Sequence, residues 1–420
     1  MKSGKNVLMI LVDCLRADRA IAMSRSKNSF LHFLVKKGVL FTQAIATTSF
    51  TNPSVASIMT GLYPFNHGVR SFLDKLRKCY PTIADILLGA GYNTCAMVTG
   101  PLLPQLGFNR GFKTYMVRDT NQTIFTNFKE QIQKFLKNAR KPWFLFLHLW
   151  ELHYPVYFPI NKRGIFVLNK YDTCLSFLDQ ELSVLLEDLD LNSTVVIFLS
   201  DHGERIPTLL ESLQNNLISI VSERLRKEVW IKISESIFKK SELARKRQGH
   251  GFSLAEELIR IPLILAGGDL PENKVVKDLI THVDIFPTLL NLLGLKSRIK
   301  IHFDGVDLTP LIKEDKHFTD RFIYIGPAGI YVKKEDQIEG LRGQKWKYLE
   351  RNNVPIALYD LKNDPQEQYN LLHLNKHVVR MLRKEMKNIK SITCSKALTS
   401  YEKGKIRYLR KFLAPKPDKT

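Results

Sequence analysis

The chain has 420 residues, with 63 Lys plus Arg against 41 Asp plus Glu, which gives a formal net charge of +22. A hydrophobic fraction of 44% is enough for a sizeable core and excludes a mainly disordered chain, and the length fits one large domain plus a smaller one. The positive excess makes nucleic acid, an anionic membrane or an anionic substrate the first partners to consider.

The N-terminal apolar run, Val7–Val12, ends at the carboxylate of Asp13. Because a secretory signal needs about 7–15 apolar residues, this short run is better explained as a buried strand. No window reaches the ~18 apolar residues of a membrane span. The five cysteines are scattered and form no paired framework. We therefore expect a soluble, cytoplasmic protein without a signal peptide or transmembrane segment.

Short, continuous apolar runs recur along the chain and predict strands that are covered on both faces. These runs are Val7–Val12, Cys95–Thr99, Trp143–Leu149, Thr194–Leu199 and Ile261–Ala266. Amphipathic stretches between them, such as Thr82–Leu88 and Tyr171–Leu189, predict helices. The alternation indicates an α/β sandwich around a mostly parallel sheet. In such sheets ligands bind beyond the carboxyl ends of the strands.

The pattern changes in three places, which set the expected domain boundaries. A helical insertion with ten basic and five acidic residues is expected at 205–249, inside an α/β domain that covers 1–312. A small subdomain is expected at 313–375, with an antiparallel sheet built from Arg321–Ile325, Gly329–Lys333 and Gln344–Leu349. The last stretch, 376–420, carries 14 basic and 3 acidic residues and is expected to be a helical tail.

Polar residues follow two of the predicted strands. Asp13 follows the first strand, and Asp201 and His202 follow the fourth, within Ser200-Asp201-His202-Gly203-Glu204. Carboxylate oxygens and imidazole nitrogens are ligands that a divalent cation takes in proteins. A single Asp after a strand is also a common helix cap, so Asp13 alone would not define a site. The Asp201-His202 sequence favours a metal site.

A third polar segment lies at Thr51–Pro64. Pro53 suits the first turn of a helix and Gly61 suits its end, which places Thr51 or Asn52 at or just before the N-cap. The free N–H groups there favour an anion. Thr51 is therefore either a capping residue or a hydroxyl nucleophile activated by a metal, and the stretch alone does not separate the two.

Taken in order, these segments resemble the sulfatase-like branch of the alkaline phosphatase superfamily. The resemblance is carried by Asn6–Asp18, Thr51–Pro64 with His67-Gly68-Val69, Leu106–Phe112, Leu149–Pro155, Ser200–Glu204, Gly249–Phe252 leading to Arg260–Leu263, His282–Leu290, and Leu358–Pro365 with Glu367 and Asn370. It implies an alkaline phosphatase-like sandwich with a smaller C-terminal α+β subdomain.

The resemblance also implies roles for individual residues. The ligands of one divalent metal would be Asp13, Thr51, Asp201 and His202, with Cys14 as a further candidate. Thr51 would be the nucleophile, and the substrate-binding or proton-transferring residues would be Asn52, His153 and His250. His148 is expected to be a buried strand residue rather than part of the site.

Three departures from the family pattern shift these expectations. Sulfatases carry Cys or Ser followed by x-Pro-x-Arg, and that residue is oxidised to formylglycine; here Thr51 and Val55 stand at those positions, so no formylglycine is expected. Cys14 replaces the second of two adjacent aspartates. His202 replaces the Asn of many calcium sulfatases, which favours Mn²⁺ or Zn²⁺ over Ca²⁺.

The sequence therefore predicts a metal-dependent hydrolase of phosphate esters, with phosphodiesters as the first substrate class. The enzyme alternatives are a sulfate-ester hydrolase and a transferase of phosphoglycerol or phosphoethanolamine. A degenerate family member acting as a basic binding protein is the non-enzyme alternative. The substrate is expected to be anionic, and the basic tail is expected to contact an anionic polymer or membrane surface.

Overall fold

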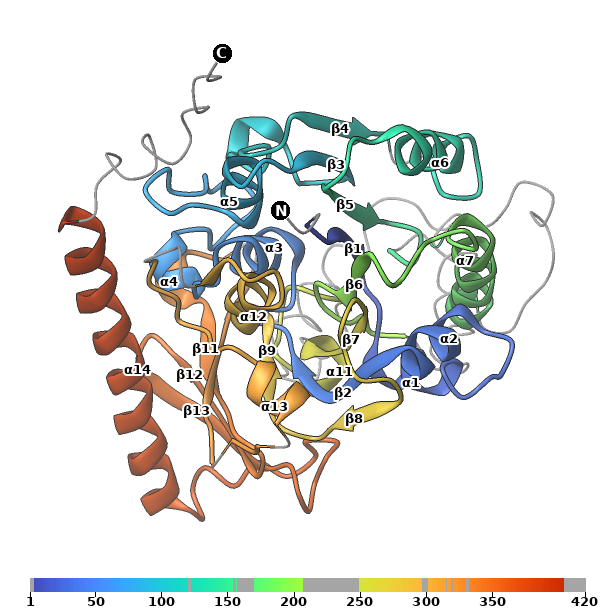
Figure 1. Cartoon of the computed structure of the whole chain (residues 1–420). Helices are drawn as coiled ribbons and strands as arrows, with labels where there is room; N and C mark the ends of the chain where they lie inside the picture. The colour runs from blue at the N-terminus through green and yellow to red at the C-terminus, as the bar shows by residue number, and fades with distance from the viewer. Residues whose placement is uncertain are drawn as a thin grey trace, which may run out of the picture.

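The computed structural model describes residues 4–119, 122–153, 156, 170–206, 249–296, 301–314, 316–318, 320–329 and 332–403, with the side chains of the last helix described as far as residue 391 (Figure 1). Nearly all of the predicted insertion, 207–248, and the end of the predicted tail, 404–420, lie outside the described residues. Among the described residues, no helix has the length and apolar character needed to cross a membrane.

A large mixed sheet forms the centre of the molecule. Its strands are β1 Asn6–Val12, β2 Gly38–Ile45, β3 Asn93–Thr99, β4 Thr114–Arg118, β5 Trp143–Leu149, β6 Thr194–Ser200, β7 Arg260–Gly267, β8 Lys274–Val276 and β9 Ile280–Thr281. The order is β4-β3-β5-β1-β6-β7-β2-β8, with β9 beside β2. Only β7 runs antiparallel to its neighbours, so the predicted mostly parallel sheet is confirmed.

All five predicted strands are present in this sheet, but β2, β4 and the short strands β8 and β9 were not predicted. The short edge strand β4 is only partly buried, so its sequence lacks a continuous apolar run. In β2, a glycine at the start and polar residues at Thr42 and Gln43 interrupt the apolar pattern.

Helices cover both faces of the large sheet (Figure 1). Their bounds are α1 Ala17–Met23, α2 Phe30–Lys36, α3 Thr51–Thr60, α4 Pro64–His67, α5 Ile83–Gly89, α6 Phe128–Asn138, α7 Lys170–Leu185, α11 Glu256–Ile259, α12 Ile285–Leu292, α13 Thr309–Lys313 and α14 Lys376–Lys403. The side chains of β1 alternate between two cores, one shared with α3, α5 and α12 and the other with α1, α2, α6 and α7. Burial on both faces explains the continuous apolar run of β1.

A second sheet of four antiparallel strands packs beside the first, as predicted. Its strands, β10 Ile323–Ala328, β11 Ile338–Arg342, β12 Trp346–Arg351 and β13 Val354–Asp360, follow one another in chain order. Helix α14 lies along this sheet and buries Val378, Leu382 and Met386 against it. Basic side chains lie mainly on the exposed face of α14 as far as residue 391, while Lys390 pairs with Glu339 of β11.

The predicted strand at Gly329–Lys333 is wrong in the described residues. β10 extends to Ala328, and Gly329 has φ 107°, a left-handed conformation that ends the strand. A 3₁₀ turn at Lys334–Asp336 then leads into β11. Strands β11 and β13 were missed because Gly340 and Pro355 interrupt their apolar patterns.

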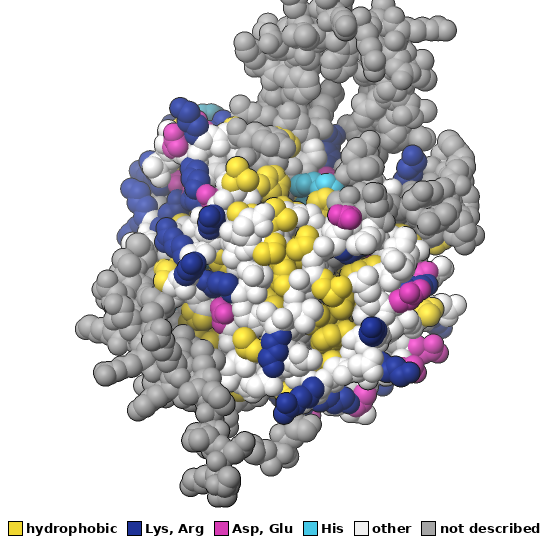
Figure 2. Space-filling model, turned by 90° about the horizontal axis from the view of Figure 1, so that it is seen from above, with side chains coloured by type: hydrophobic (Ala, Val, Ile, Leu, Met, Phe, Trp, Pro, Cys, Tyr) yellow, Lys and Arg dark blue, Asp and Glu magenta, His cyan; other side chains and the backbone are white. Residues whose placement is uncertain are grey.

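Charge is distributed around the edge of the molecule. In the view of Figure 2, Lys and Arg side chains lie around the rim of the face, while its centre is largely apolar and uncharged. The net charge of +22 is therefore not gathered at the middle of this face.

Candidate metal centre and nucleophile

The ends of β1 and β6 bring the predicted metal ligands together. The two strands are parallel, with Val12 opposite Ser200, so Asp13 and Asp201 leave the sheet side by side. Asp13, Asp201 and His202 are completely buried. The Nε2 atom of His202 lies 3.3 Å from Asp201 Oδ2 and 3.7 Å from Asp13 Oδ1.

Thr51 faces this group from the first turn of α3. Its Oγ1 lies 3.4 Å from Asp13 Oδ2, to which it donates, and 3.5 Å from His202 Nε2. The N-cap is Phe50, one residue before the predicted position, and it forms no side-chain cap. Gly61 ends the helix with φ 67°, as predicted. Thr51 therefore presents its hydroxyl to the ligands from a helix N-terminus that no side chain caps.

The tautomer of His202 can be assigned from its partner. Its Nδ1 lies 2.8 Å from the carbonyl oxygen of Gly203, which can only accept a hydrogen bond, so Nδ1 carries the proton. The Nε2 lone pair then faces the carboxylates of Asp13 and Asp201. Oδ1 of Asp13 and Oδ2 of Asp201 are buried and accept no hydrogen bond. Lone pairs that converge in a buried space repel one another unless a cation lies between them, so these residues fit a divalent metal.

The glycine of the Asp201-His202-Gly203 sequence is required by packing. A Cβ at Gly203 would lie 2.1 Å from the carbonyl oxygen of Glu257 in α11. The Gly203 N–H donates to the carbonyl of Leu258 at 2.8 Å. The backbone that carries the ligands is therefore held directly against α11.

The pKa values of the ligands reflect this crowding. Burial acts to raise the pKa of Asp13, but the nearby imidazoles of His148 and His202 outweigh it and hold the pKa well below its usual range. Burial and then the charge of Asp13 raise the pKa of Asp201 to about 8. Burial and the neighbouring His250 lower the pKa of His202 to about 4, which keeps this imidazole neutral and available as a ligand.

His148, which was expected to be a buried strand residue, is buried but also reaches the centre. Its Nε2 lies 3.3 Å from Asp13 Oδ2, and its Nδ1 has no hydrogen-bond partner. Donor atoms of Asp13, His148 and Asp201 lie within 4.8 Å of one another. A signal was present in the sequence, because His148 is the only polar residue in the apolar run of β5.

The other predicted residues surround this group. The His250 ring stacks on that of His202 with centroids 4.5 Å apart, and its Nδ1 lies 2.7 Å from Glu204 Oε2. The His153 ring stacks on Trp150 at 3.8 Å and meets the edge of His250 at 5.0 Å. Asn52 lies beside Thr51 but is fully buried, and its Nδ2 donates to the carbonyl of Phe72 at 2.9 Å.

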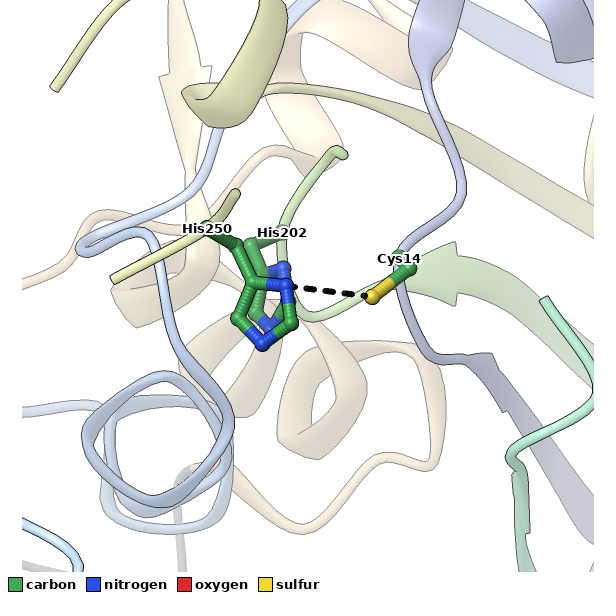
Figure 3. A group of neighbouring side chains, drawn as sticks. All are labelled: Cys14, His202 and His250. Atoms are coloured by element: carbon green, nitrogen blue, oxygen red, sulfur yellow. Dashed lines mark hydrogen bonds between the residues drawn. The ribbon is translucent and has the colours of Figure 1, made fainter. Parts of the chain in front are cut away.

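Cys14 also lies at the centre, as Figure 3 shows together with His202 and His250. Its thiol is fully buried, and burial followed by the charges of Asp13 and Glu204 raises its pKa. Glu204, whose Oε2 lies 3.6 Å from the Cys14 sulfur, was not predicted as a site residue, although it follows Asp201 in the same motif.

Comparisons with known proteins identify the family of this chain. The family model described as "Sulfatase" matches residues 5–295, and the model described as "N-sulphoglucosamine sulphohydrolase, C-terminal" matches residues 251–392. Because the first model covers more than half of the chain, the protein belongs to the sulfatase family, a branch of the alkaline phosphatase superfamily.

Individual relatives are distant. Arylsulfatase K of Gallus gallus is 26% identical over 222 residues, which is 50% of this chain and 34% of that protein. An ulvan-active sulfatase of Formosa agariphila is 24% identical over 87% of this chain and 77% of its own length. Phosphonate monoester hydrolase of Agrobacterium radiobacter has a similar structure, with a TM-score of 0.70, 18% identity, and coverage of 93% and 96% of the two chains. The chain therefore covers about a third of the length of arylsulfatase K.

Proposed function

We propose that the protein is a metal-dependent hydrolase of sulfate esters in which Thr51 is the nucleophile. The position of Thr51 carries this proposal: its hydroxyl faces Asp13 and His202 inside a buried group of unpaired ligand atoms. The sequence favoured phosphodiesters, but the relatives are named for sulfate esters. We therefore place sulfate esters first.

The reaction proceeds in two displacements at sulfur. Thr51 Oγ1, which donates to Asp13 Oδ2, loses its proton to water as it attacks the sulfur, and the bond between the sulfur and the leaving oxygen breaks. His153 or His250 gives a proton to that oxygen. Water then attacks the sulfur of the threonine sulfate, which releases sulfate and restores the hydroxyl. A divalent cation held by Asp13, Asp201 and His202 would lower the pKa of the Thr51 hydroxyl and offset the negative charge that develops.

Metal identity follows from the donor set. An imidazole among carboxylates favours Mn²⁺ or Zn²⁺, whereas Ca²⁺ prefers oxygen ligands alone. His148 is a further ligand candidate for this ion, because its donor atoms lie near those of Asp13 and Asp201. The absence of an oxidisable Cys or Ser at position 51 means that the reaction does not pass through an aldehyde hydrate.

Phosphodiesters are the second candidate substrate class, and the identity of Thr51 favours them. A threonine cannot form the aldehyde that formylglycine sulfatases use, whereas direct attack by a hydroxyl suits phosphorus as well as sulfur. Both substrates present a tetrahedral anionic centre to the same residues, so the two candidates differ only in the group that is transferred.

The test compares Thr51→Ala and Thr51→Ser with the wild type on nitrophenyl sulfate, nitrophenyl phosphate and bis-nitrophenyl phosphate. We expect Thr51→Ala to lose at least about 10³-fold in kcat/KM and Thr51→Ser to keep most activity. Thr60→Ala, which removes the same side chain from the other end of α3, is the matched control. A rapid-quench sample should carry a sulfate on the peptide that contains Thr51.

Activity that survives in Thr51→Ala would contradict the nucleophile. Faster turnover of the diester than of the sulfate would place phosphodiesters first. Turnover that requires an added alcohol would indicate a transferase, and a metal-loaded protein that turns over none of the three substrates would support a binding protein.

A further inference from the structure

A second group of ligand atoms lies beside the first. The proposed reaction uses only His250 from this group, as the alternative to His153 in proton transfer. Cys14 follows Asp13 after β1, Glu204 ends the segment after β6, and His250 comes from the far side of the segment 207–248. Cys14 Sγ lies 3.6 Å from Glu204 Oε2 and 3.7 Å from His250 Nδ1. Glu204 Oε2 and His250 Nδ1 are 2.7 Å apart. The three atoms therefore converge on one point from three parts of the chain.

Two of these three separations are close to those of a tetrahedral zinc site. Metal–ligand distances of about 2.3 Å to sulfur and about 2.0–2.2 Å to nitrogen and oxygen place neighbouring ligand atoms roughly 3.3–3.6 Å apart. The two separations that involve Cys14 are already close to this value. The third separation, between Glu204 Oε2 and His250 Nδ1, is shorter because a hydrogen bond joins these two atoms. A metal ion would replace the proton of this hydrogen bond.

The backbone around Cys14 directs its thiol toward this point. Cys14 has φ 63°, in the left-handed region that a residue other than glycine rarely adopts. Two hydrogen bonds hold the turn: Tyr171 Oη donates to the carbonyl of Cys14 at 2.6 Å, and Ser200 Oγ accepts from the N–H of Leu15 at 3.0 Å. The turn is therefore held from α7 and from the end of β6, and it orients Sγ toward Glu204 and His250.

The second group is adjacent to the first but uses different atoms. His202 separates the two, because its Nε2 faces Asp13 and Asp201 while its ring stacks on His250. In Figure 3 the thiol of Cys14 points toward the paired imidazoles.

We propose that Cys14, Glu204 and His250 form a second metal site that takes Zn²⁺. Thiolate, imidazole and carboxylate ligands suit zinc, and three protein ligands leave one coordination position open, as in catalytic zinc sites. This site goes beyond the single divalent ion of the proposed function. With His250 as a metal ligand, His153 is the residue that gives a proton to the leaving oxygen. The sulfur donor argues against Ca²⁺ and Mg²⁺ as the bound ion, because both take oxygen ligands.

The test measures metal content and cobalt absorption, neither of which depends on activity. Metal-free protein is reloaded with Zn²⁺ or Co²⁺, bound metal per chain is counted by mass spectrometry, and the thiolate-to-cobalt charge-transfer band is recorded. We expect two ions per chain and a strong band in the wild type. Cys14→Ala should bind one ion and lose the band, and Glu204→Gln should bind one ion.

Two controls separate this site from other causes. Cys174→Ala removes another fully buried thiol, which donates to the carbonyl of Glu151, and should keep both ions and the band. Asp201→Asn should lose one ion and keep the band, because Asn removes a charged ligand of the first group while its oxygen can still accept from the N–H of Cys14. Thermal unfolding of each variant distinguishes a loss of metal from a loss of fold, and we expect every variant to unfold cooperatively.

One ion per chain and no thiolate band in the wild type would overturn the second site, while ester hydrolysis by that protein would leave the proposed function standing. Retention of two ions by both Cys14→Ala and Glu204→Gln would also overturn it. In the converse case, two ions with the band but no hydrolysis would support the site and contradict the proposed function.

Discussion

At the scale of single residues, the orientation of His202 is set by the backbone rather than by another side chain. The carbonyl of Gly203 holds the Nδ1 proton, and the close contact of Gly203 with α11 holds that carbonyl. No substitution of a neighbouring side chain removes this acceptor. His148 has no such partner at Nδ1, so its position depends on Asp13 and on packing in β5.

This difference leads to a prediction for His148→Ala. If His148 Nε2 helps to hold the ion near Asp13, the variant should bind Mn²⁺ or Zn²⁺ about 10–100-fold more weakly, as when supporting groups of metal sites are removed. Isothermal titration with metal-free protein measures this. His32→Ala, whose partner is the carbonyl of Ser24 far from the site, is the control. An unchanged metal affinity in His148→Ala would contradict the role.

The predicted site residues lie at strand ends, whereas the residues that were missed lie within a strand or join the site through a distant part of the chain. Asp13, Asp201 and His202 were found because they directly follow apolar strands, where the sheet topology determines which residues meet. His148 lies within a strand, and its reach toward Asp13 depends on the pairing of β5 with β1, which no local pattern contains. Glu204 joins the site through His250, which is 46 residues away, so only the fold brings the pair together.

At the scale of elements, the loop after β5 is held by a buried ion pair. Arg118 at the end of β4 lies 3.2 Å from Glu151, and the side chains are 3% and 0% exposed. Glu151 also accepts from the N–H of Ile124 at 2.7 Å, and Arg118 donates to the carbonyl of His148 at 3.1 Å. This pair fixes the backbone on both sides of Trp150, on which His153 stacks.

Glu151→Gln should therefore destabilise the protein strongly. Removing one partner of a buried pair leaves a buried charge on Arg118 and costs about 3–5 kcal/mol. Glu181→Gln breaks the more exposed pair with Lys129 and should cost no more than about 1 kcal/mol. Urea unfolding of both variants measures the two values, and similar losses in both would contradict the argument.

Helix α14 presents a row of cations on its outer face. Lys376, Arg380, Lys384 and Lys387 are exposed and recur at helical spacing along the same side. An exposed row of cations can attract an anionic polymer, and the contact expected from the sequence stays a prediction.

Reversal of this charge tests that partner. A variant with Arg380→Glu, Lys384→Glu and Lys387→Glu should raise the KM for a sulfated polymer several-fold at low salt, because the attraction between opposite charges is lost. The KM for nitrophenyl sulfate should not change. A variant with the matching number of substitutions on another face, Lys27→Glu, Lys36→Glu and Lys37→Glu, is the control. Equal effects of the two variants would contradict a specific role for α14.

At the scale of the whole molecule, a buried cluster of charges joins the two sheets. Glu256 in α11 lies 3.1 Å from Arg342 in β11 and 3.3 Å from Lys347 in β12. Lys347 also pairs with Glu367 at 2.6 Å. Since α11 leads into β7 of the large sheet, this cluster connects the small sheet to the element that supports Gly203.

The cluster makes stability depend on pH. Burial acts to raise the pKa of Glu256, but Lys347 and Arg342 outweigh it and lower the pKa from 4.5 to about 2. A lowered pKa contributes stability above the unfolded-state value, and this contribution is lost as the pH falls from 4.5 toward 2. Burial raises the pKa of Glu367, which acts in the opposite direction.

Glu256→Gln removes the first contribution and weakens the second, because the charge of Glu256 also acts to raise the pKa of Glu367. The difference in unfolding free energy between the wild type and this variant should therefore shrink, by on the order of 2–3 kcal/mol, between neutral pH and strongly acidic pH. Urea titrations across that range measure it. Glu272→Gln, at an exposed surface pair with Lys37, should differ little from the wild type at any pH. A difference that stays constant with pH would contradict the linkage.

The hydrogen bonds of Glu204 have a consequence for how this protein can be altered. Its Oε1 accepts from the backbone N–H groups of Arg205 and His250, at 2.7 and 3.2 Å, and these two residues bracket the long basic segment between them. The two ends of that segment are thus fastened at a single oxygen atom, next to the ligands. A substitution that removes this oxygen would therefore act on both ends of the segment, and on the neighbouring ligand atoms, at the same time.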